Sequence, residues 1–211
     1  MSKLARFKAE LEQRVLRIAR DRRAVKKLRG LIKREKAKTM RLSDAGAKFI
    51  TSFEGYSPVP TDKVDGFSTV GFGHLIAHRP VNSADLRAKW VPGQRRGGYL
   101  YEPEALELFK RDVSKTYVPA VAALFKDGTL DFDQHLFDAL VSAAFNLGIG
   151  AVRPGTAGFE TLGRAISAGS PKAIAAALPL YVNGPNGPLP GLVRRRRAEA
   201  RLIRTGSYST E

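Results

Sequence analysis

The sequence predicts an α+β protein that is mostly helical, and three observations support this. Apolar residues recur with helical periods through the second half of the 211-residue chain. One short segment, residues 66–73, places Phe, Thr and Val between glycines and is typical of a tight hairpin. The apolar fraction of 43% is enough for a packed core, and the absence of Cys excludes a disulfide framework. We therefore expect a helical domain with one small β element near its beginning.

Positive charge is concentrated at the start of the chain. Residues 1–40 hold 15 Lys and Arg against 4 Asp and Glu, whereas residues 41–211 hold 21 against 16. This change in composition predicts two parts, a basic helical arm over residues 1–40 and a second domain over residues 41–211. The net charge of +16 indicates an anionic partner such as nucleic acid, an anionic membrane or an acidic wall polymer.

The basic arm has the pattern of an amphipathic helix. It contains no Pro, and apolar residues recur in it every seven positions at Leu4, Leu11, Ile18, Val25 and Ile32. Arg14 and Asp21 interrupt the second apolar position of the heptad, so the stripe is narrow. Three interpretations stay open: a helix packed on the second domain, a helix that binds anionic lipid or wall polymer, and self-association. Nucleic-acid binding is disfavoured, because no interleaved aromatic residues accompany the charge.

The second domain shows clear element boundaries. Ser43 is a good N-cap for a helix over residues 44–53. Pro58 and Pro60 then prevent the helix from continuing. The hairpin at 66–73 and a loop from His78 to Gly98 follow. The helical periods after this loop cover residues 102–126, 131–147, 156–168, 171–181 and 190–204.

Several classes of chemistry are excluded by missing motifs. The sequence has no P-loop, no GxSxG elbow, no HExxH and no cluster with metal-ligand spacing. It has no transmembrane stretch and no secretory signal. We therefore expect carboxylate chemistry without a metal or a cofactor.

Three acidic residues near the hairpin are candidates for that chemistry. Glu54 ends the first helix of the second domain just before Gly55, where partial desolvation would keep a carboxyl protonated as a general acid. Asp62 and Asp65 lie on the segment that enters the hairpin, where a carboxylate can stay ionised. Two carboxyls in unlike environments are what glycoside hydrolysis requires, and the Thr69 hydroxyl can orient a water molecule.

The order of these motifs resembles that of bacteriophage lysozymes, glycoside hydrolase family 24. The residues FEG at 53–55, then an Asp, then TVGFGHL at 69–75 resemble the active-site signature of that family. Residues 137–148 resemble its central helix, and GLVRRRRAE at 191–199 resembles its C-terminal segment. The resemblance covers roughly residues 42–204 and leaves the basic arm outside.

The resemblance implies a lysozyme-like fold, with a helical lobe and a small β-hairpin lobe, and a muramidase activity. The substrate would be the β-1,4 bond between N-acetylmuramic acid and N-acetylglucosamine in peptidoglycan. Glu54 would be the general acid, the Asp would act on the attacking water, and Thr69 would position that water. Inversion of configuration is implied, with carboxyls about 6.5–9.5 Å apart.

The second carboxylate departs from the family pattern. Counted without gaps, the family's Asp falls on Lys63, one residue after Asp62 and two before Asp65. We favour Asp62 and keep Asp65 as the alternative. Asn146 resembles a family position that faces the cleft and is the candidate for substrate binding, although hydrogen bonding at the helix end is an equal interpretation. His74 is interpreted as a scaffold residue.

In biological terms the resemblance implies a phage endolysin. Such a protein is made in the host cytoplasm without a signal peptide, reaches the cell wall with the help of a holin, and lyses the host. Residues 1–40 would strengthen attraction to anionic wall polymer or membrane, and this attraction would weaken with salt. The alternatives are a virion-associated wall-degrading module and a catalytically inactive peptidoglycan-binding protein.

Overall fold

The computed structural model describes residues 13, 16–17, 20–22, 24–25, 40–63 and 66–211. The chain forms two compact units, Met1–Thr39 and Met40–Glu211. The described residues of the first unit are helical and exposed, among them Leu16 and Val25. Most of the predicted apolar repeat of the arm lies outside the described residues, so its three interpretations stay predictions.

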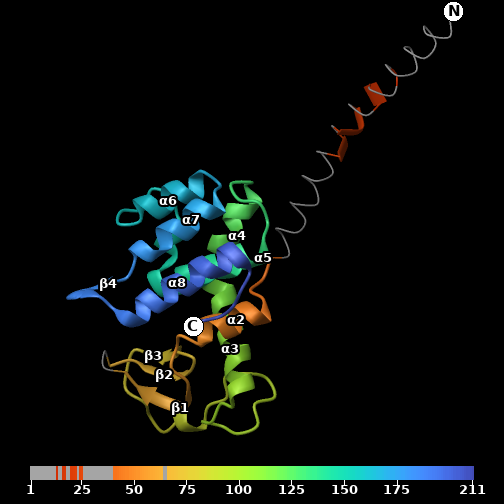
Figure 1. Ribbon diagram of the computed structural model, residues 1–211. Helices are drawn as coiled ribbons and strands as arrows, with labels where there is room; N and C mark the ends of the chain where they lie inside the picture. The colour runs from red at the N-terminus through yellow and green to blue at the C-terminus, as the bar shows by residue number, and fades with distance from the viewer. Residues whose placement is uncertain (1–12, 14–15, 18–19, 23, 26–39, 64–65) are drawn as a thin grey trace, which may run out of the picture. The chain divides into compact units, whose positions relative to one another are not determined.

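The second unit is mostly helical with a small antiparallel sheet, which confirms the predicted fold class. Its helices are α2 (Asp44–Thr51), α3 (Glu102–Thr116), α4 (Val118–Lys126), α5 (Gln134–Leu147), α6 (Glu160–Ser167), α7 (Pro171–Ala177) and α8 (Pro190–Thr205). Its strands are β1 (Ser57–Asp62), β2 (Ser68–Gly71), β3 (His74–Ala77), β4 (Asn183–Gly184) and β5 (Gly187–Pro188). In Figure 1 the three-stranded sheet lies at one end of this unit and α4 to α8 at the other.

The sheet has the order β1–β2–β3, and both pairs are antiparallel. Pro58 and Pro60 lie in β1, which is an edge strand, where the missing N–H of proline is tolerated. The predicted hairpin at 66–73 is therefore present as β2 and the turn into β3.

Apart from shifts of a few residues at helix ends, two features differ from the sequence-based expectation. The helical period predicted over 102–126 is divided between α3 and α4 at Tyr117, two residues before Pro119. Pro119 lies in the first turn of α4, because a proline cannot donate the hydrogen bond that would continue α3. The β4–β5 hairpin was not predicted. Its sequence, NGPNGP at 183–188, carries turn residues but almost no strand formers.

The core is built around α5. Nine consecutive residues, 136–144, are buried, which is typical of a helix enclosed on all sides. Helices α2, α4 and α8 pack against it. No helix in the described part of the chain is long and apolar enough to cross a membrane.

Asp138 of α5 joins three segments that are distant in sequence. Its fully buried carboxylate accepts hydrogen bonds from Ser43 Oγ at 2.5 Å, Tyr208 Oη at 2.7 Å and Gln134 Nε2 at 2.9 Å. Ser43 is the N-cap of α2, as predicted, and its side chain accepts from the Gly46 N–H. A Cβ at Gly46 would lie only 2.5 Å from the Asp138 carboxyl carbon, so this close packing requires glycine.

We expect the bond between Tyr208 and Asp138 to make stability sensitive to alkaline pH. Burial raises the pKa of Tyr208 to about 12, and the hydrogen bond to Asp138 acts in the same direction. A tyrosine in the unfolded chain titrates near pKa 10. The stabilising contribution is therefore complete below about pH 10 and is lost as pH rises toward 12. Urea unfolding at pH 9 and pH 11 measures this loss.

In Tyr208→Phe the same pH change should remove less stability than in the wild type. Tyr101→Phe, at an exposed tyrosine, is the control and should behave like the wild type. An equal loss in Tyr208→Phe and in the control would contradict the prediction.

Candidate active site

Glu54 is placed by the end of α2. After the helix ends, the Glu54 N–H still donates to the Thr51 carbonyl at 3.0 Å, and Gly55 follows. The Glu54 side chain is 27% exposed, and its Oε1 accepts a hydrogen bond from Arg195 Nη1 at 2.6 Å. The predicted general acid is therefore partly exposed and held by a guanidinium.

Arg195 is itself fixed on all sides. Its side chain is only 3% exposed. Its guanidinium lies 5.2 Å from the ring centre of Phe53 and 5.9 Å from that of Phe145, and its Nη2 donates to the Ser142 carbonyl at 3.3 Å. In the sequence this arginine stands in the run RRRR at 194–197, and no local signal distinguishes it from its neighbours.

A buried charged cluster lies behind Arg195. Glu199 and Arg196 are fully buried, and Glu199 Oε1 accepts from Ser142 Oγ at 2.6 Å, from Arg196 Nη2 at 2.9 Å and from Arg195 Nε at 3.3 Å. Burial raises the pKa of Glu199 and lowers the pKa of Arg196, while the opposite charges counteract both shifts. We call Ser142, Arg195, Arg196 and Glu199 the buried cluster. Through Arg195, which donates to Glu54 Oε1, this cluster holds the carboxylate of Glu54 in place.

The hairpin places Asp62 and Thr69 on neighbouring strands. Thr69 lies opposite Thr61, and Asp62 lies opposite Ser68. Because side chains alternate between the faces of a strand, the register puts Asp62 and Thr69 on alternate faces of the hairpin. Asp62 is exposed, and its Oδ1 accepts from the Val81 N–H at 2.7 Å. The alternative carboxylate, Asp65, lies outside the described residues.

The two remaining candidates each have a partner within the protein. Asn146, in the last turn of α5, accepts from Arg196 Nη2 through its Oδ1 at 3.0 Å, which links it to the buried cluster. Its side chain is nevertheless exposed, so its amide N–H₂ can still reach a ligand. His74 Nδ1 lies 2.5 Å from Asp112 Oδ2 and joins β3 to α3, in agreement with a scaffold role.

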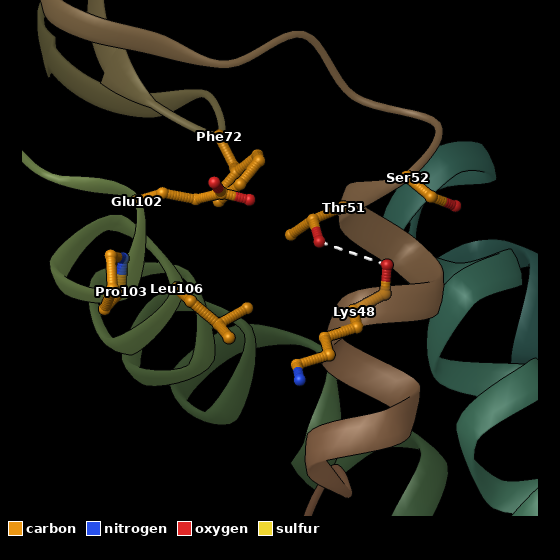
Figure 2. Close-up of a pocket in the computed structure, with 7 residues that line it drawn as sticks. All are labelled: Lys48, Thr51, Ser52, Phe72, Glu102, Pro103 and Leu106. Atoms are coloured by element: carbon orange, nitrogen blue, oxygen red, sulfur yellow. Dashed lines mark hydrogen bonds between the residues drawn. The ribbon is translucent and has the colours of Figure 1, made fainter.

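A pocket of about 570 Å³ lies on the side of α2 that faces α3. Figure 2 shows Lys48 and Thr51 of α2 across from Glu102, Pro103 and Leu106 of α3, with Phe72 at the β2–β3 turn. None of the candidate catalytic residues lines this pocket. Within the described residues, no group of three His, Asp or Glu side chains could hold a metal ion.

Comparisons with known proteins match most of the second unit. The family model described as phage lysozyme matches residues 51–199. The endolysin of Bacillus phage B103 is 33% identical over 172 residues, which are 79% of this chain and 55% of that protein.

Two solved structures match this chain over most of its length and over nearly all of their own length. The muramidase domain of SpmX from Asticaccaulis excentricus has a TM-score of 0.58 and 29% identity, and the match covers 78% of this chain and 98% of that one. The endolysin from Escherichia coli O157:H7 phage FAHEc1 has a TM-score of 0.57 and 27% identity, with 81% and 98% covered.

The chain spans little more than half the length of the curated relatives it matches. The matched residues 51–199 nevertheless include Glu54, the hairpin, α5 and the buried cluster. With this match, the chain belongs to the phage lysozyme family.

Proposed function

We propose that this protein is a muramidase that hydrolyses the β-1,4 bond between N-acetylmuramic acid and N-acetylglucosamine in peptidoglycan, and that it serves as a phage endolysin. One observation carries the proposal: Glu54, which lies three residues after the end of α2, is held at 2.6 Å by an almost completely buried arginine. Family membership supports the same conclusion, as do relatives that are named endolysin and muramidase domain.

In the proposed reaction Glu54 donates its proton to the glycosidic oxygen as the bond to the sugar breaks. Asp62, or Asp65 in its place, accepts a proton from the attacking water on the opposite face of the ring. The Thr69 hydroxyl would position that water beside Asp65, whereas Asp62 lies on the other face of the hairpin from Thr69 and would act on the water without that hydroxyl. Attack from the opposite face inverts the anomeric configuration. Arg195 fixes the orientation of Glu54, because its own guanidinium is held by Glu199 and Ser142.

The remaining roles concern binding and delivery. We propose that Asn146 contacts the glycan through its free amide group. Residues 1–40 would attract the protein to anionic wall polymer or membrane. Release from the host cytoplasm with the help of a holin would bring the enzyme to the wall.

The experiment is reducing-sugar release from purified peptidoglycan by the wild type, Asp62→Asn and Asp65→Asn. Asp127→Asn, a change of the same type at an exposed turn on the helical lobe, is the control and should keep full activity. We expect the wild type to release reducing sugar and one of the two hairpin variants to lose this activity. Asp62→Asn is the expected variant, because Asp62 is the favoured second carboxylate. Loss in Asp65→Asn alone would move the second role to Asp65.

The product also tests the stereochemistry. Proton NMR of the freshly formed reducing end should show the α anomer first, because inversion of a β bond produces it. If the folded wild type sediments with peptidoglycan but releases no reducing ends, the protein is a glycan-binding module and not an enzyme.

A further inference from the structure

Helix α8 carries far more positive charge than its buried contacts use. Its 16 residues include six arginines and one acid. Arg195 and Arg196 point inward and pair with Glu199. The other four, which we call the arginine strip, are Arg194, Arg197, Arg201 and Arg204. Their spacing of three, four and three residues places them along one face of the helix, over about 15 Å.

Three of the four arginines of the strip line a surface pocket, and Arg204 lies outside it. This pocket has a volume of about 500 Å³ and is formed by Pro188, Pro190, Val193, Arg194, Arg197, Arg201 and Glu211. Within the described part of the chain, no ion pair is recorded for any arginine of the strip, and Glu211 is the one acid that lines the pocket. The pocket is therefore lined by three guanidinium groups and by the apolar side chains of Pro188, Pro190 and Val193.

An arrangement of this kind opposes helix formation unless an anion is present. Like charges three and four residues apart on a helix repel each other. A purely structural arginine would be paired with an acid or would cover apolar core. Of the four, Arg194 has a contact with an aromatic ring, that of Phe53 at 5.5 Å, and the described residues provide no acidic ion-pair partner for any of them. The remaining charges are free to bind an external anion.

The arginine strip begins close to Glu54, and this position favours an anionic partner that is attached to the glycan substrate. Arg194 and Arg195 both lie over the Phe53 ring, and Phe53 directly precedes Glu54. One end of the strip is therefore next to the candidate catalytic carboxylate. An anionic chain attached to the glycan strand could occupy the strip while the glycan is cleaved. Two linked contacts of this kind raise the effective affinity well above that of either contact alone.

We propose that the arginine strip binds a linear phosphodiester polymer of the bacterial cell wall. The guanidinium group matches the geometry of phosphate oxygens, and a row of four fits a repeating anion better than a single ion. Duplex or single-stranded nucleic acid carries the same charges. However, no aromatic ring lines the pocket for the bases of a single strand to stack on, and the binding test below includes duplex DNA as the competing ligand. The proposal rests on the proposed muramidase function, because that function brings the protein to the wall.

The test compares two double variants of the full chain. Arg197→Gln with Arg201→Gln removes two charges from the strip and leaves every contact of Glu54 intact. Arg164→Gln with Lys172→Gln is the control, because it removes two exposed charges from α6 and α7. The basic arm is unchanged in both, so its contribution cancels. Binding to poly(glycerol phosphate), to poly-glutamate and to duplex DNA is measured at several salt concentrations.

We expect the strip variant to bind poly(glycerol phosphate) about tenfold more weakly than the control, with a shallower dependence on salt. Its reducing-sugar release should fall on walls that retain their phosphate polymer and should equal that of the control on purified, phosphate-free peptidoglycan. That second substrate tests the muramidase function separately from this proposal.

Three results would overturn the proposal. The first is equal weakening in the strip variant and the control, which would show that net charge alone attracts the polymer. The second is no binding of poly(glycerol phosphate) by the wild type. The third is a strip-dependent affinity for DNA or poly-glutamate that matches or exceeds that for the phosphate polymer, which would assign the strip to another partner.

Discussion

Glu54→Gln is expected to reduce the rate of peptidoglycan hydrolysis by about 10²- to 10⁴-fold, the range of a positioned general acid. The amide keeps the shape of the side chain and can still accept a hydrogen bond from Arg195, but it has no acidic proton to donate. Because the Glu54 side chain is 27% exposed and Arg195 keeps Glu199 and Ser142 as partners, the fold should persist.

The measurement is the initial rate of reducing-end formation, together with the unfolding temperature. Glu107→Gln is the matched control, since it removes a carboxylate from an exposed ion pair with Lys110 on α3. An exposed ion pair contributes about 0–1 kcal/mol to the free energy of unfolding. Its removal in Glu107→Gln should therefore leave both the fold and the rate of hydrolysis unchanged. A folded Glu54→Gln protein with more than a tenth of the wild-type rate would exclude Glu54 as the general acid.

The parts of this fold that follow from the sequence depend on local physics. Ser43 is predictable as an N-cap because it directly precedes a helical stretch, and the bond that it accepts from the Gly46 N–H spans only three residues. The hairpin at 66–73 and the position of Glu54 after a helix likewise depend on short stretches of chain. The break between α3 and α4 was missed, since apolar periodicity continues across Tyr117 although Pro119 divides the helix.

The parts that did not follow depend on contacts between distant residues. Glu54 and Arg195 are 141 positions apart, and nothing in the run RRRR at 194–197 identifies which arginine turns inward. The rotation of α8 about its own axis, as it packs on α5, decides which arginines turn inward. In the observed packing Arg195 and Arg196 are buried, whereas Arg194 and Arg197 are exposed. In the sequence the four are equivalent members of one run. The structure separates a cluster that supports Glu54 from a strip that faces solvent.

The second carboxylate shows another limit. Asp62 was favoured over Asp65 by counting residues, but the face on which a strand residue lies is set by its register. The observed register puts Asp62 on the face of Ser68 rather than on the face of Thr69. Comparison of Asp62→Asn with Asp65→Asn in the reducing-sugar assay therefore decides which carboxylate acts on the water.

Glu199→Gln is expected to lower the free energy of unfolding by about 3–5 kcal/mol, because it leaves two buried arginines with one anion fewer. Arg196 would lose the most electrostatic stabilisation, because it is fully buried. Its Nε lies 2.9 Å from Glu199 Oε2 and forms an ion pair there, although the geometry is not that of a hydrogen bond. For a domain of this size the loss corresponds to a decrease in unfolding temperature of about 10 °C. Calorimetry at pH 7 measures it.

A second variant separates the charge of Glu199 from its packing. Glu199→Leu combined with Arg196→Leu removes one buried pair and still leaves Arg195 with Glu54 and Ser142. Because a buried ion pair can be replaced by apolar side chains with little loss, the double variant should unfold at a higher temperature than Glu199→Leu alone. Its reducing-end formation should nevertheless stay below that of the wild type, since Arg195 loses the carboxylate that fixes its Nε. Unfolding of Glu199→Gln at the wild-type temperature would show that the cluster contributes nothing to stability, and full activity in the double variant would show that Arg195 holds Glu54 without it.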